Sequence, residues 1–537
     1  MRFLNLLRRE AGERGRLVAA STVLAGIAMG ASMAVVNAVA GTAEEGLHFG
    51  LLILFGLLAV LYLATKKYAL AQTGALVQDL VRRIRERIAD DVRHTGLASL
   101  EHIGKARVSA VLSRDCYVIS EAGERVVQGT ISAFMLAFSA IYIATLSMFA
   151  FLMTVGAVFC AIFFYRRTQR TSREILVQSN EKETEFFAAT EHLLDGFKEV
   201  KLSTDRSEDL YGNHVKQLAG LAADLRVAAT MTFVRGANVS QMFFYLLLAM
   251  IVFILPQFGL ESNVVIKITY IILFISGPIE MVVIALPVLA KANVAVENIS
   301  QLETDLRNAG ADADPPRHGA GGMSEIQCLG MTFSYVEKDG QQGFTVGPFN
   351  VTLRAGEVIF ITGGNGSGKS TFLKLLTGLY APSTGTLLWD GRAVGVTNLA
   401  AYRNLFSVIF SDFHLFDRLY GIPQPDQGRV DELLAAMKID RKTAFRDGVF
   451  TNLDLSTGQR KRLAYVAARL EDRPIYVFDE WAADQDPSYR QYFYHSMIPT
   501  LRSEGKTVIV VTHDDRYFDI ADRRLAMEEG RLEEITA

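Results

Sequence analysis

The chain has 537 residues and a mass of 59.3 kDa, and 50% of its residues are hydrophobic, which gives a mean hydropathy of +0.21. So apolar a composition over so long a chain excludes a disordered protein and disfavours an ordinary soluble one. The 55 basic and 58 acidic residues leave a net charge of −3, so we expect no nucleic-acid partner. Cys116, Cys160 and Cys328 lie far apart and form no Cys-x-x-Cys pair, which argues against a disulfide framework or a zinc site.

The apolar residues are concentrated in the first half, where several stretches are long enough to cross a membrane. Residues 17–40 correspond to about 36 Å of helix, against a hydrocarbon core of about 30 Å. A cleavable signal peptide is the competing interpretation, but the apolar run is too long, and Met1 to Arg16 looks like an amphipathic helix. Residues 128–165 carry no charge and would form one helix of about 57 Å, so two helices with a turn near Ser147 fit better. The predicted transmembrane domain, residues 1–305, contains spans at 17–40, 49–65, 128–147, 148–165, 241–259 and 264–290.

The distribution of basic residues predicts how these spans are oriented. Arginines precede the first span, and Lys and Arg residues follow the second, fourth and sixth spans, whereas the connection 41–50 contains Glu44 and Glu45 but no Lys or Arg. Because basic residues stay on the cytoplasmic side, both termini are expected in the cytoplasm, with the chain crossing a bacterial inner membrane several times. A lipid bilayer is therefore an expected partner.

Two long connections on the predicted cytoplasmic side carry charged residues with apolar residues at helical spacing, as in 171–202. We interpret them as extensions of the spanning helices; two independent soluble insertions are the alternative, but no turn cluster separates them from the spans. Residues 306–325, rich in Ala, Asp, Gly and Pro, are predicted to be a linker. Short β-branched runs then alternate with helical patterns, which predicts an α/β domain over residues 326–537.

The α/β domain begins with a phosphate-binding motif. An apolar strand pattern at 358–362 precedes a G-x-x-x-x-G-K-[ST] sequence, and a helical pattern follows it. Glycines let backbone N–H groups surround phosphates, and the helix N-terminus adds positive charge. Lys369 is expected to reach the β- and γ-phosphates of a nucleoside triphosphate, and the Ser370 hydroxyl to bind Mg²⁺. The predicted phosphate-binding residues are Gly363, Gly364, Asn365, Gly366, Ser367, Gly368, Lys369, Ser370 and Thr371.

A second apolar strand pattern, 475–478, ends in Asp479 and Glu480. A carboxylate at such a strand end can hold the hydration shell of Mg²⁺, and the next one can polarise an attacking water. Asp479 is therefore a predicted metal residue and Glu480 a predicted catalytic residue. Such a pair alone is more often an ordinary strand terminus, but downstream of the phosphate-binding motif it is a specific signal.

The sequence Leu455-Ser456-Thr457-Gly458-Gln459 then makes the second half resemble the nucleotide-binding domain of ATP-binding cassette (ABC) transporters. The six spans extend that resemblance over the whole chain. It implies that the signature residues Ser456, Thr457, Gly458 and Gln459 of one subunit close over ATP held by another. It also implies that His513 contacts the γ-phosphate as a catalytic residue, that Asp486 lies in the loop crossing the dimer interface, and that Tyr335 stacks on adenine; Tyr335 could instead simply pack.

Two departures from the family pattern stand out. The usual glutamine that senses Mg²⁺ is expected within 406–412, but Ser411 occupies its place, so either Ser411 acting through a water or Asp412 could serve the metal. Trp481, Ala482 and Ala483 replace the usual Pro-Thr-Ser. The second variant, together with segments 364–368 and 410–417, resembles bacterial cyclic-peptide and siderophore exporters, similar to pyoverdine-precursor, syringomycin and microcin exporters.

The resemblance implies a six-helix transmembrane domain of the type IV ABC exporter kind, followed by an α/β P-loop domain, in a homodimer with swapped helices. Coupling helices are expected near 108–122 and 193–202. Because about 16 residues precede the first span, no peptidase domain and no processing of a leader peptide are expected. The predicted function is ATP-driven export of a peptide-type product by alternating access. A lipid or glycolipid flippase is the main alternative, and an ATP-gated regulator or channel is disfavoured because Lys369, Glu480 and His513 are all present.

One residue in the sixth span is a candidate contact for the cargo. Glu280 follows Gly277 and Pro278, which permit a break in the helix. An ionisable group at that depth is costly in lipid, so it is expected to face the cavity of the dimer and contact a polar or cationic part of the cargo. Alternatively, Glu280 caps the freed backbone or pairs with a neighbouring helix.

Overall fold

The computed structural model describes residues 2–40, 48–309, 322–336, 342–422 and 425–535. The chain divides into two compact units. The first unit comprises Met1–Arg85 and Val111–Ile299, and the second comprises Glu86–Ala110 and Ser300–Ala537. Most of the predicted connection 41–50 and most of the predicted linker 306–325 lie outside the described residues.

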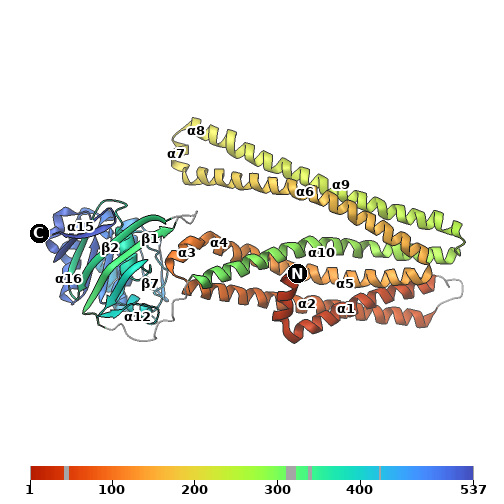
Figure 1. Cartoon of the computed structure of the whole chain (residues 1–537), viewed down its shortest axis with the longest axis horizontal. Coiled ribbons are helices and arrows are strands. Elements are labelled where there is room, and N and C mark those ends of the chain that lie inside the picture. Colours follow the sequence, from red (N-terminus) through yellow and green to blue (C-terminus); the bar gives the residue numbers. More distant parts are fainter. Residues whose placement is uncertain (1, 41–47, 310–321, 337–341, 423–424, 536–537) are drawn as a thin grey trace. The chain divides into compact units, whose positions relative to one another are not determined.

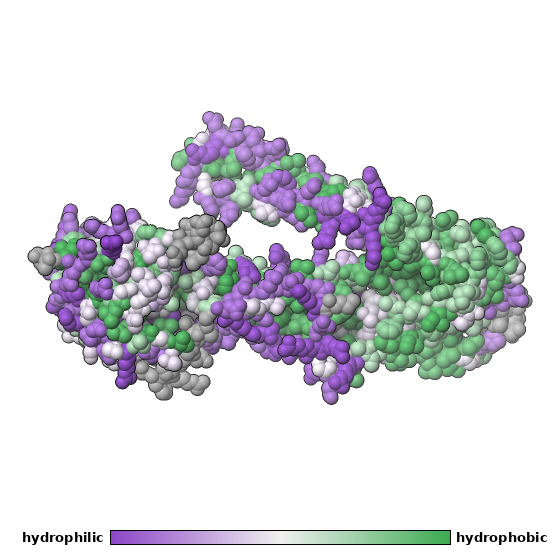
Figure 2. Space-filling view, viewed as in Figure 1, coloured by the Kyte–Doolittle hydropathy of each residue, from purple (hydrophilic) through white to green (hydrophobic). Residues whose placement is uncertain are grey.

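Long helices build the first unit (Figure 1). The six principal helices are α1 (Arg2–Ala40), α2 (Phe49–His94), α5 (Cys116–Leu146), α6 (Met148–Asp195), α9 (Lys216–Ala249) and α10 (Ser262–Asn308). Shorter helical segments lie between them: η2 (Val111–Asp115), α7 (Phe197–Lys201), α8 (Thr204–Glu208), η3 (Asp209–Val215), η4 (Met250–Ile254) and η5 (Leu255–Phe258). Among the described residues, 6 helical segments are long and apolar enough to cross a membrane. Figure 2 shows hydrophobic residues covering one end of these helices and hydrophilic residues covering the rest.

Two local features shape the first unit. The chain reverses at Ser147, where the sequence predicts a turn: Ser147 is extended, and its side chain accepts a hydrogen bond from the Ala150 N–H at 3.3 Å. Helix α1 packs closely on α5 through two glycines, because a Cβ atom at Gly26 would lie 2.6 Å from the Phe134 side chain and one at Gly30 2.6 Å from Phe138. Small residues at this spacing let two membrane helices approach.

Helix α10 stays helical through Pro278, so the break that the sequence permits at this position is not formed. Proline removes one backbone donor and crowds the preceding turn, but a long, packed helix can absorb this cost. Two residues before Pro278, the Ser276 hydroxyl donates to the Leu273 carbonyl at 2.9 Å. Glu280 is exposed on this helix within the single chain.

Helices α6 and α9 form a long hairpin closed by α7 and α8, and Figure 1 shows its far end standing apart from the other helices of the first unit. Ser179 donates to the Ala222 carbonyl at 2.9 Å, and Arg226 pairs with Glu183 at 3.1 Å. The tip of the hairpin is largely polar but carries two exposed apolar side chains, Phe197 and Leu202, the second of them 88% exposed.

The second unit contains a four-stranded antiparallel sheet, a six-stranded sheet and a two-stranded hairpin. The orders are β2-β1-β4-β5 and β12-β11-β3-β10-β9-β6. The strands are β1 (Glu325–Val336), β2 (Gln342–Arg354), β3 (Val358–Thr362), β4 (Thr384–Trp389), β5 (Arg392–Ala393), β6 (Phe406–Ile409), β7 (Phe445–Arg446), β8 (Val449–Phe450), β9 (Ile475–Asp479), β10 (Thr507–Val511), β11 (Arg523–Glu528) and β12 (Arg531–Ile535).

Hydrophobic cores cover both faces of the six-stranded sheet. Val358 and Phe360 of β3 point into one core, and Ile359 and Ile361 point into the other, because successive side chains of a strand face opposite ways. Strands β11, β3, β10, β9 and β6 are parallel, which requires both faces to be buried and explains the continuous apolar runs in the sequence. Their carboxyl ends therefore meet at one edge.

Short helices complete the second unit: α3 (Leu97–Ile103), α4 (Lys105–Ala110), α11 (Lys369–Leu376), α12 (Leu399–Arg403), α13 (Gln427–Ala436), α14 (Thr457–Glu471), η6 (Trp481–Asp484), α15 (Pro487–Tyr492), η7 (Phe493–Met497), α16 (Ile498–Ser503) and η8 (Asp515–Ile520). Although α3 and α4 follow the membrane-type helix α2 in sequence, they belong to this unit. Leu97 and Ala98 pack against the core that contains Phe372.

Candidate functional site

The loop between β3 and α11 adopts a conformation that only glycine tolerates at several positions. Gly363, Gly366 and Gly368 have φ angles of 144°, 78° and 107°. A Cβ atom on Gly363 would lie 2.2 Å from the Met527 carbonyl oxygen, so a side chain there would collide with β11. The loop is a backbone-lined cradle that leads into the N-terminus of α11, as the sequence predicts.

Lys369 is folded into this cradle. Its Nζ donates hydrogen bonds to the carbonyls of Gly363 and Gly364, both at 2.8 Å, and the residue is only 6% exposed. The Ser367 hydroxyl is buried and has no hydrogen-bond partner among the described residues. A buried donor without a partner is costly. A phosphate oxygen in the cradle would satisfy it, so the loop fits a nucleotide.

Two hydroxyls and one carboxylate meet at the end of β9. Asp479 Oδ2 accepts hydrogen bonds from Ser370 Oγ at 3.3 Å and Ser411 Oγ at 3.2 Å, and the Ser411 N–H lies 3.4 Å away. Burial raises the pKa of Asp479, while the hydrogen bonds from Ser411 lower it. Asp412 is exposed. Of the two residues that the sequence leaves open for the metal, the fold brings Ser411 to the carboxylate.

No group of three or more His, Cys, Asp or Glu side chains with metal-binding geometry occurs in the described part of the chain. Mg²⁺ commonly takes one or two carboxylates and completes its shell with water and substrate phosphates. Ser370 and Asp479 match that minimal donor set, so the site suits a metal that arrives with a nucleotide.

Glu480 and His513 lie at the carboxyl ends of neighbouring parallel strands. The register pairs Asp479 with Val511, and the Glu480 N–H donates to the Val511 carbonyl at 3.1 Å. Glu480 has left-handed backbone angles, φ 52° and ψ 36°, which are uncommon outside glycine. This turn brings its Oε1 to 3.6 Å from His513 Nε2. The fold thus brings Glu480 and His513, some thirty residues apart in sequence, together as a carboxylate–imidazole pair.

The signature residues begin helix α14. Ser456 caps its N-terminus and forms a reciprocal capping box with Gln459. A Cβ atom on Gly458 would lie 2.6 Å from the Asp484 carbonyl oxygen, so glycine is required for the close approach of the segment after Glu480. Among the hydrogen bonds of the described residues, none joins Ser456, Thr457, Gly458 or Gln459 to the loop 363–368 of the same chain.

Gln485, which the sequence analysis did not single out, fastens the signature to the segment after β9. Its Nε2 donates to the Gly458 carbonyl at 3.1 Å, and its Oε1 accepts from Arg462 Nε at 2.8 Å. Arg462 also pairs with Asp486 at 2.9 Å. Hydrogen bonds from Ser488 and Tyr489, with the Arg462 contact, lower the pKa of Asp486 to about 2. No sequence signal identifies Gln485, because its partners come from a separate helix.

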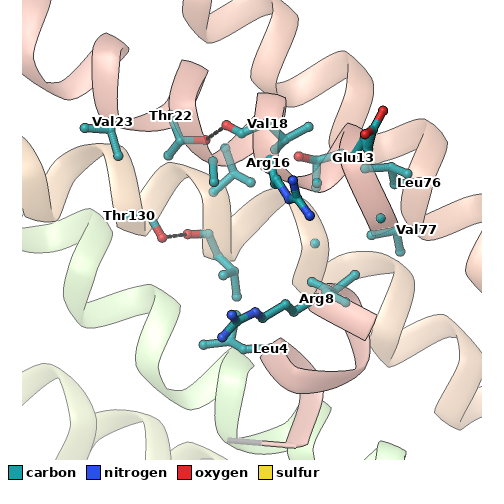
Figure 3. A pocket seen from close by; sticks show the side chains of 18 of the residues that line it. Leu4, Arg8, Glu13, Arg16, Val18, Thr22, Val23, Leu76, Val77 and Thr130 are labelled. Atoms are coloured by element: carbon teal, nitrogen blue, oxygen red, sulfur yellow. Dashed lines mark hydrogen bonds between the residues drawn. The ribbon is translucent and has the colours of Figure 1, made fainter. Parts of the chain in front are cut away.

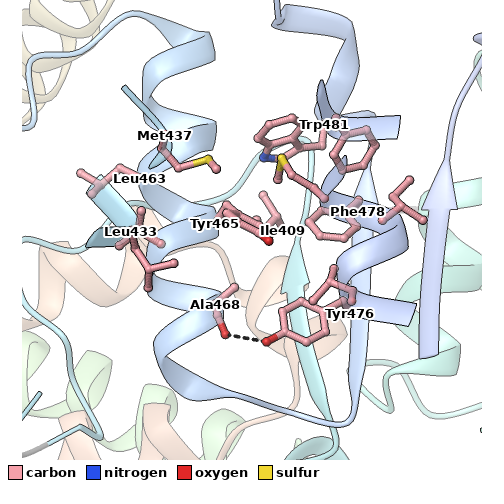
Figure 4. Packing of buried hydrophobic residues seen from close by; sticks show 14 of the residues in the cluster. Ile409, Leu433, Met437, Leu463, Tyr465, Ala468, Tyr476, Phe478 and Trp481 are labelled. Atoms are coloured by element: carbon pink, nitrogen blue, oxygen red, sulfur yellow. Dashed lines mark hydrogen bonds between the residues drawn. The ribbon is translucent and has the colours of Figure 1, made fainter. Parts of the chain in front are cut away.

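Trp481, one of the departures from the family pattern, is a buried core residue. Its ring stacks on Phe493 with centroids 4.7 Å apart, and its Nε1 donates to the Lys461 carbonyl at 3.0 Å. Figure 4 shows the indole packed with Phe478 and Tyr465 between α14 and the sheet. Lys461 Nζ in turn donates to the Glu480 carbonyl at 2.7 Å. The indole therefore supports the turn that presents Glu480.

Tyr335 packs among other aromatic rings, which is the alternative that the sequence left open. Its hydroxyl lies 2.9 Å from Thr371 Oγ1, and its ring meets Phe333 edge-on at 5.1 Å. The Tyr380 ring stacks on the Phe333 ring, with their centroids 4.6 Å apart. Tyr335 remains partly exposed, so stacking on an adenine stays a prediction for its free surface.

Glu101 of α3 is a further residue that the sequence did not identify. The Tyr380 hydroxyl donates to Glu101 Oε2 at 2.5 Å, and Lys374 Nζ lies 3.1 Å from Glu101 Oε1. Burial, followed by the hydrogen bond to Glu101, raises the pKa of Tyr380. This contact joins the helical connection to the α/β domain at residue 101, and the coupling segments near 108–122 and 193–202 stay predictions. Glu101 gave no signal in sequence because its partners lie more than 270 residues away.

Known proteins resemble this chain in sequence and in fold. Residues 346–483 match the family description "ABC transporter". The chain is 31% identical over 525 residues to ATP-binding protein SyrD of Pseudomonas syringae pv. syringae, covering 95% of this chain and 92% of that protein. Over 241 residues it is 31% identical to the ATP-dependent lipid A-core flippase of Burkholderia pseudomallei (strain 1710b), covering 41% and 40%. A solved bacterial Atm1-family ABC exporter with ATP bound matches with a TM-score of 0.73 and 17% identity, covering 97% and 95%.

Proposed function

Since this chain belongs to the ATP-binding cassette transporter family, we propose that it exports a peptide-type natural product across the bacterial inner membrane. Family membership makes the chain a multi-pass membrane protein and an exporter that couples ATP hydrolysis to transport. A cyclic or otherwise constrained peptide, or a siderophore precursor, is the proposed cargo. Both termini lie in the cytoplasm in this proposal, because the arginines before the first span and after the fourth favour that side.

The proposed ATP site uses the residues that meet at the carboxyl edge of the sheet. Lys369 and the N–H groups of the loop 363–368 hold the phosphates, Ser370 and Asp479 hold Mg²⁺ with Ser411, and Glu480 accepts a proton from the attacking water. His513 holds the γ-phosphate next to Glu480. The observation that carries this assignment is the 3.6 Å pairing of Glu480 with His513 beside the hydroxyl–carboxylate cluster of Asp479.

Two copies of the chain are needed to complete this site. Within one chain, no described hydrogen bond connects the signature to the phosphate-binding loop, so a second copy is proposed to bring Ser456, Thr457, Gly458 and Gln459 over the nucleotide. The exposed side chains of Phe197 and Leu202 at the hairpin tip are a second reason, since a partner surface would cover them. Exposed rings of Phe416 and Tyr420, with centroids 5.5 Å apart, offer a matching apolar surface on the partner.

The proposed role of Ser411 can be separated from that of Asp412 by Mg²⁺ titration. We expect Ser411→Ala to raise the Mg²⁺ concentration for half-maximal ATPase activity several-fold, because a hydrogen bond contributes about 1 kcal/mol. Asp412→Asn is the matched control, and it should leave the titration unchanged because, among the hydrogen bonds of the described residues, Asp479 accepts from Ser411 and not from Asp412. The reverse result would assign the metal to Asp412, and two normal titrations would leave the loop with a coupling role only.

The cargo class rests on two sequence relationships. The variant segments at 364–368, 410–417 and 481–483 resemble cyclic-peptide and siderophore exporters, and the SyrD match extends over nearly the whole chain. The flippase match covers 40% of that protein, so lipid or glycolipid transport remains the second candidate function. In both cases Glu280, exposed on α10, is the proposed cargo contact.

Cargo stimulation distinguishes the two candidates. In lipid vesicles, ATPase activity of the full-length protein should rise with a cationic cyclic peptide and not with a lipid A-type glycolipid. Glu280→Gln should weaken half-maximal stimulation about tenfold, the loss typical of one charge-assisted hydrogen bond, with basal activity unchanged. Glu261→Gln, which removes an exposed carboxylate just before α10, is the matched control. Stimulation by the glycolipid alone would instead support the flippase, and loss of basal activity in Glu280→Gln would indicate a structural role.

A further inference from the structure

A cavity lies beneath the bent start of helix α1. Residues 2–11 and 13–40 are joined at Gly12, whose φ of 51° and ψ of −133° break the helix. The segment before the bend is anchored to α10: the Phe3 N–H donates to Asn293 Oδ1 at 2.9 Å, the Phe3 side chain is buried, and Arg2 pairs with Glu297. The bend leaves a space of about 890 Å³ between α1, α2 and α5, within the usual range for ligand sites.

The walls of this cavity are more apolar than its three threonines would suggest. Three threonines line it, but each hydroxyl donates to the carbonyl four residues earlier in its own helix: Thr22 to Val18 and Thr130 to Val126, both drawn in Figure 3, and Thr73 to Ala69. Their hydroxyls are therefore satisfied without a ligand. The other walls come from Leu, Val, Ala and Phe side chains, including Val77 and Phe134.

One end of the cavity is positively charged. Arg8 and Arg16 line it, and Figure 3 shows both side chains directed to the space between the helices, whereas the Glu13 carboxylate points away from them. Neither arginine forms an ion pair among the described residues. Other basic residues of the first unit do: Arg83 pairs with Glu10 and Asp79. Two arginines without a counter-ion thus border an apolar pocket.

The charged end and the apolar walls of the cavity are arranged like the headgroup and the acyl chains of a membrane lipid. The apolar run of α1 begins at Leu17, directly after Arg16, and the predicted span of α5 begins at Gln128, so on both helices the cavity extends across the cytoplasmic end of the span; on α2 it lies beyond that end, at Thr73 to Val77. An arginine fork binds a phosphate through paired charge-assisted hydrogen bonds, and the apolar walls would hold acyl chains. We propose that this cavity binds a single anionic phospholipid, with its phosphate on Arg8 and Arg16 and an acyl chain along Thr73, Val77 and Thr130.

Charge favours a lipid over a second copy of the chain as the occupant. The helices of the protruding hairpin carry Arg166, Arg167 and Arg170 on α6 and Arg235 on α9, directly beside their apolar stretches. At the depth of Arg16, just outside the apolar stretch, a hairpin from another copy would present these arginines, which is repulsive, since the first carboxylates of α6, Glu174 and Glu181, lie further along the helix. An anionic headgroup would neutralise both arginines. This site is separate from the proposed cargo and from the ATP site.

Lipid retention by the purified, full-length protein tests the proposal. The protein is exchanged into detergent, phosphatidylglycerol and phosphatidylcholine are added, and bound lipids are counted by native mass spectrometry. We expect phosphatidylglycerol to be retained in preference to phosphatidylcholine, and Arg8→Gln with Arg16→Gln to weaken this retention about tenfold or more. Arg9→Gln with Arg14→Gln removes the same charge from residues that do not line the cavity, and should leave retention unchanged.

A phosphatidylglycerol probe with a photoreactive acyl chain locates the site. Its label should appear on the peptides containing Thr73 to Val77 and Gly123 to Thr130, and Ala19→Trp, which fills the cavity from α1, should abolish it. Equal loss of lipid in both double variants would show that the total surface charge, and not this cavity, retains the lipid, and would overturn the proposal. Labelling elsewhere, or crosslinking of Ala19→Cys in one copy to a second copy, would also overturn it and make this surface a subunit interface.

Discussion

Glu480→Gln should nearly abolish steady-state ATP hydrolysis while leaving ATP binding intact. A carboxylate can accept a proton from the attacking water, whereas an amide cannot, and loss of such a base typically costs about 100- to 10,000-fold in rate. This corresponds to about 2.7 to 5.5 kcal/mol of activation free energy. The substitution keeps the side-chain volume and the backbone hydrogen bond from Glu480 to Val511, so the fold and the nucleotide affinity should not change. Turnover and equilibrium binding of ATP measure the two effects separately.

The control for this variant is another acid-to-amide change on the same domain. Glu471, at the end of α14, accepts a hydrogen bond from Ser407 at 2.9 Å, and a glutamine oxygen can accept it equally well. Glu471→Gln should therefore hydrolyse ATP at close to the unmodified rate. A decrease of less than about tenfold in Glu480→Gln, or about 1.4 kcal/mol, would remove Glu480 from the role of base.

Lys369→Ala should act at the binding step instead. The ammonium group already donates two hydrogen bonds at the mouth of the phosphate-binding loop, and in the proposed complex it transfers them to phosphate oxygens. A hydrogen bond to a charged group contributes about 1.5 to 3 kcal/mol, so the affinity for ATP should fall about 10- to 100-fold. Titration with a fluorescent ATP analogue measures the affinity, and thermal unfolding checks the folding of the variant, because Lys369 is buried.

Lys374 offers a matched control on the same helix. It lies five positions further along α11 and binds Glu101 and Tyr380 rather than the loop. Lys374→Ala should retain ATP affinity but weaken the contact between α3 and the α/β domain, so cargo-stimulated ATPase should fall while basal ATPase persists. An equal loss of ATP affinity in both variants would show that general damage to α11, and not loss of the phosphate contact, explains Lys369→Ala.

Local sequence patterns determined most of the proposed ATP site. The loop 363–368, the apolar strands before it and before Asp479, and the signature at Ser456 are contiguous segments whose residue types already specify their backbone: glycines where φ is positive, and apolar runs where both faces of a sheet are covered. The six apolar stretches followed from length and composition in the same way. The resemblance to ABC transporters then assigned a role to each of these segments.

Only the tertiary structure decided which distant residues meet. That Ser411 lies beside Asp479 depends on how β6 pairs with β9, because that register brings the end of β6 to the end of β9. The same holds for the Glu101–Tyr380 contact and for Gln485 beneath Gly458. Helical continuity at Pro278 was decided by packing, which outweighs the local preference of one residue.

The cavity beneath α1 shows most clearly which features the sequence determined and which depended on the tertiary structure. The sequence by itself determined that arginines precede the first apolar stretch and that Gly12 lies among them. It could not determine that Phe3 would dock on Asn293 of α10, folding the start of the chain back over Thr73 and Thr130. Contacts across some 290 residues depend on the free energy of burying whole helices against each other, and no local pattern encodes that partner.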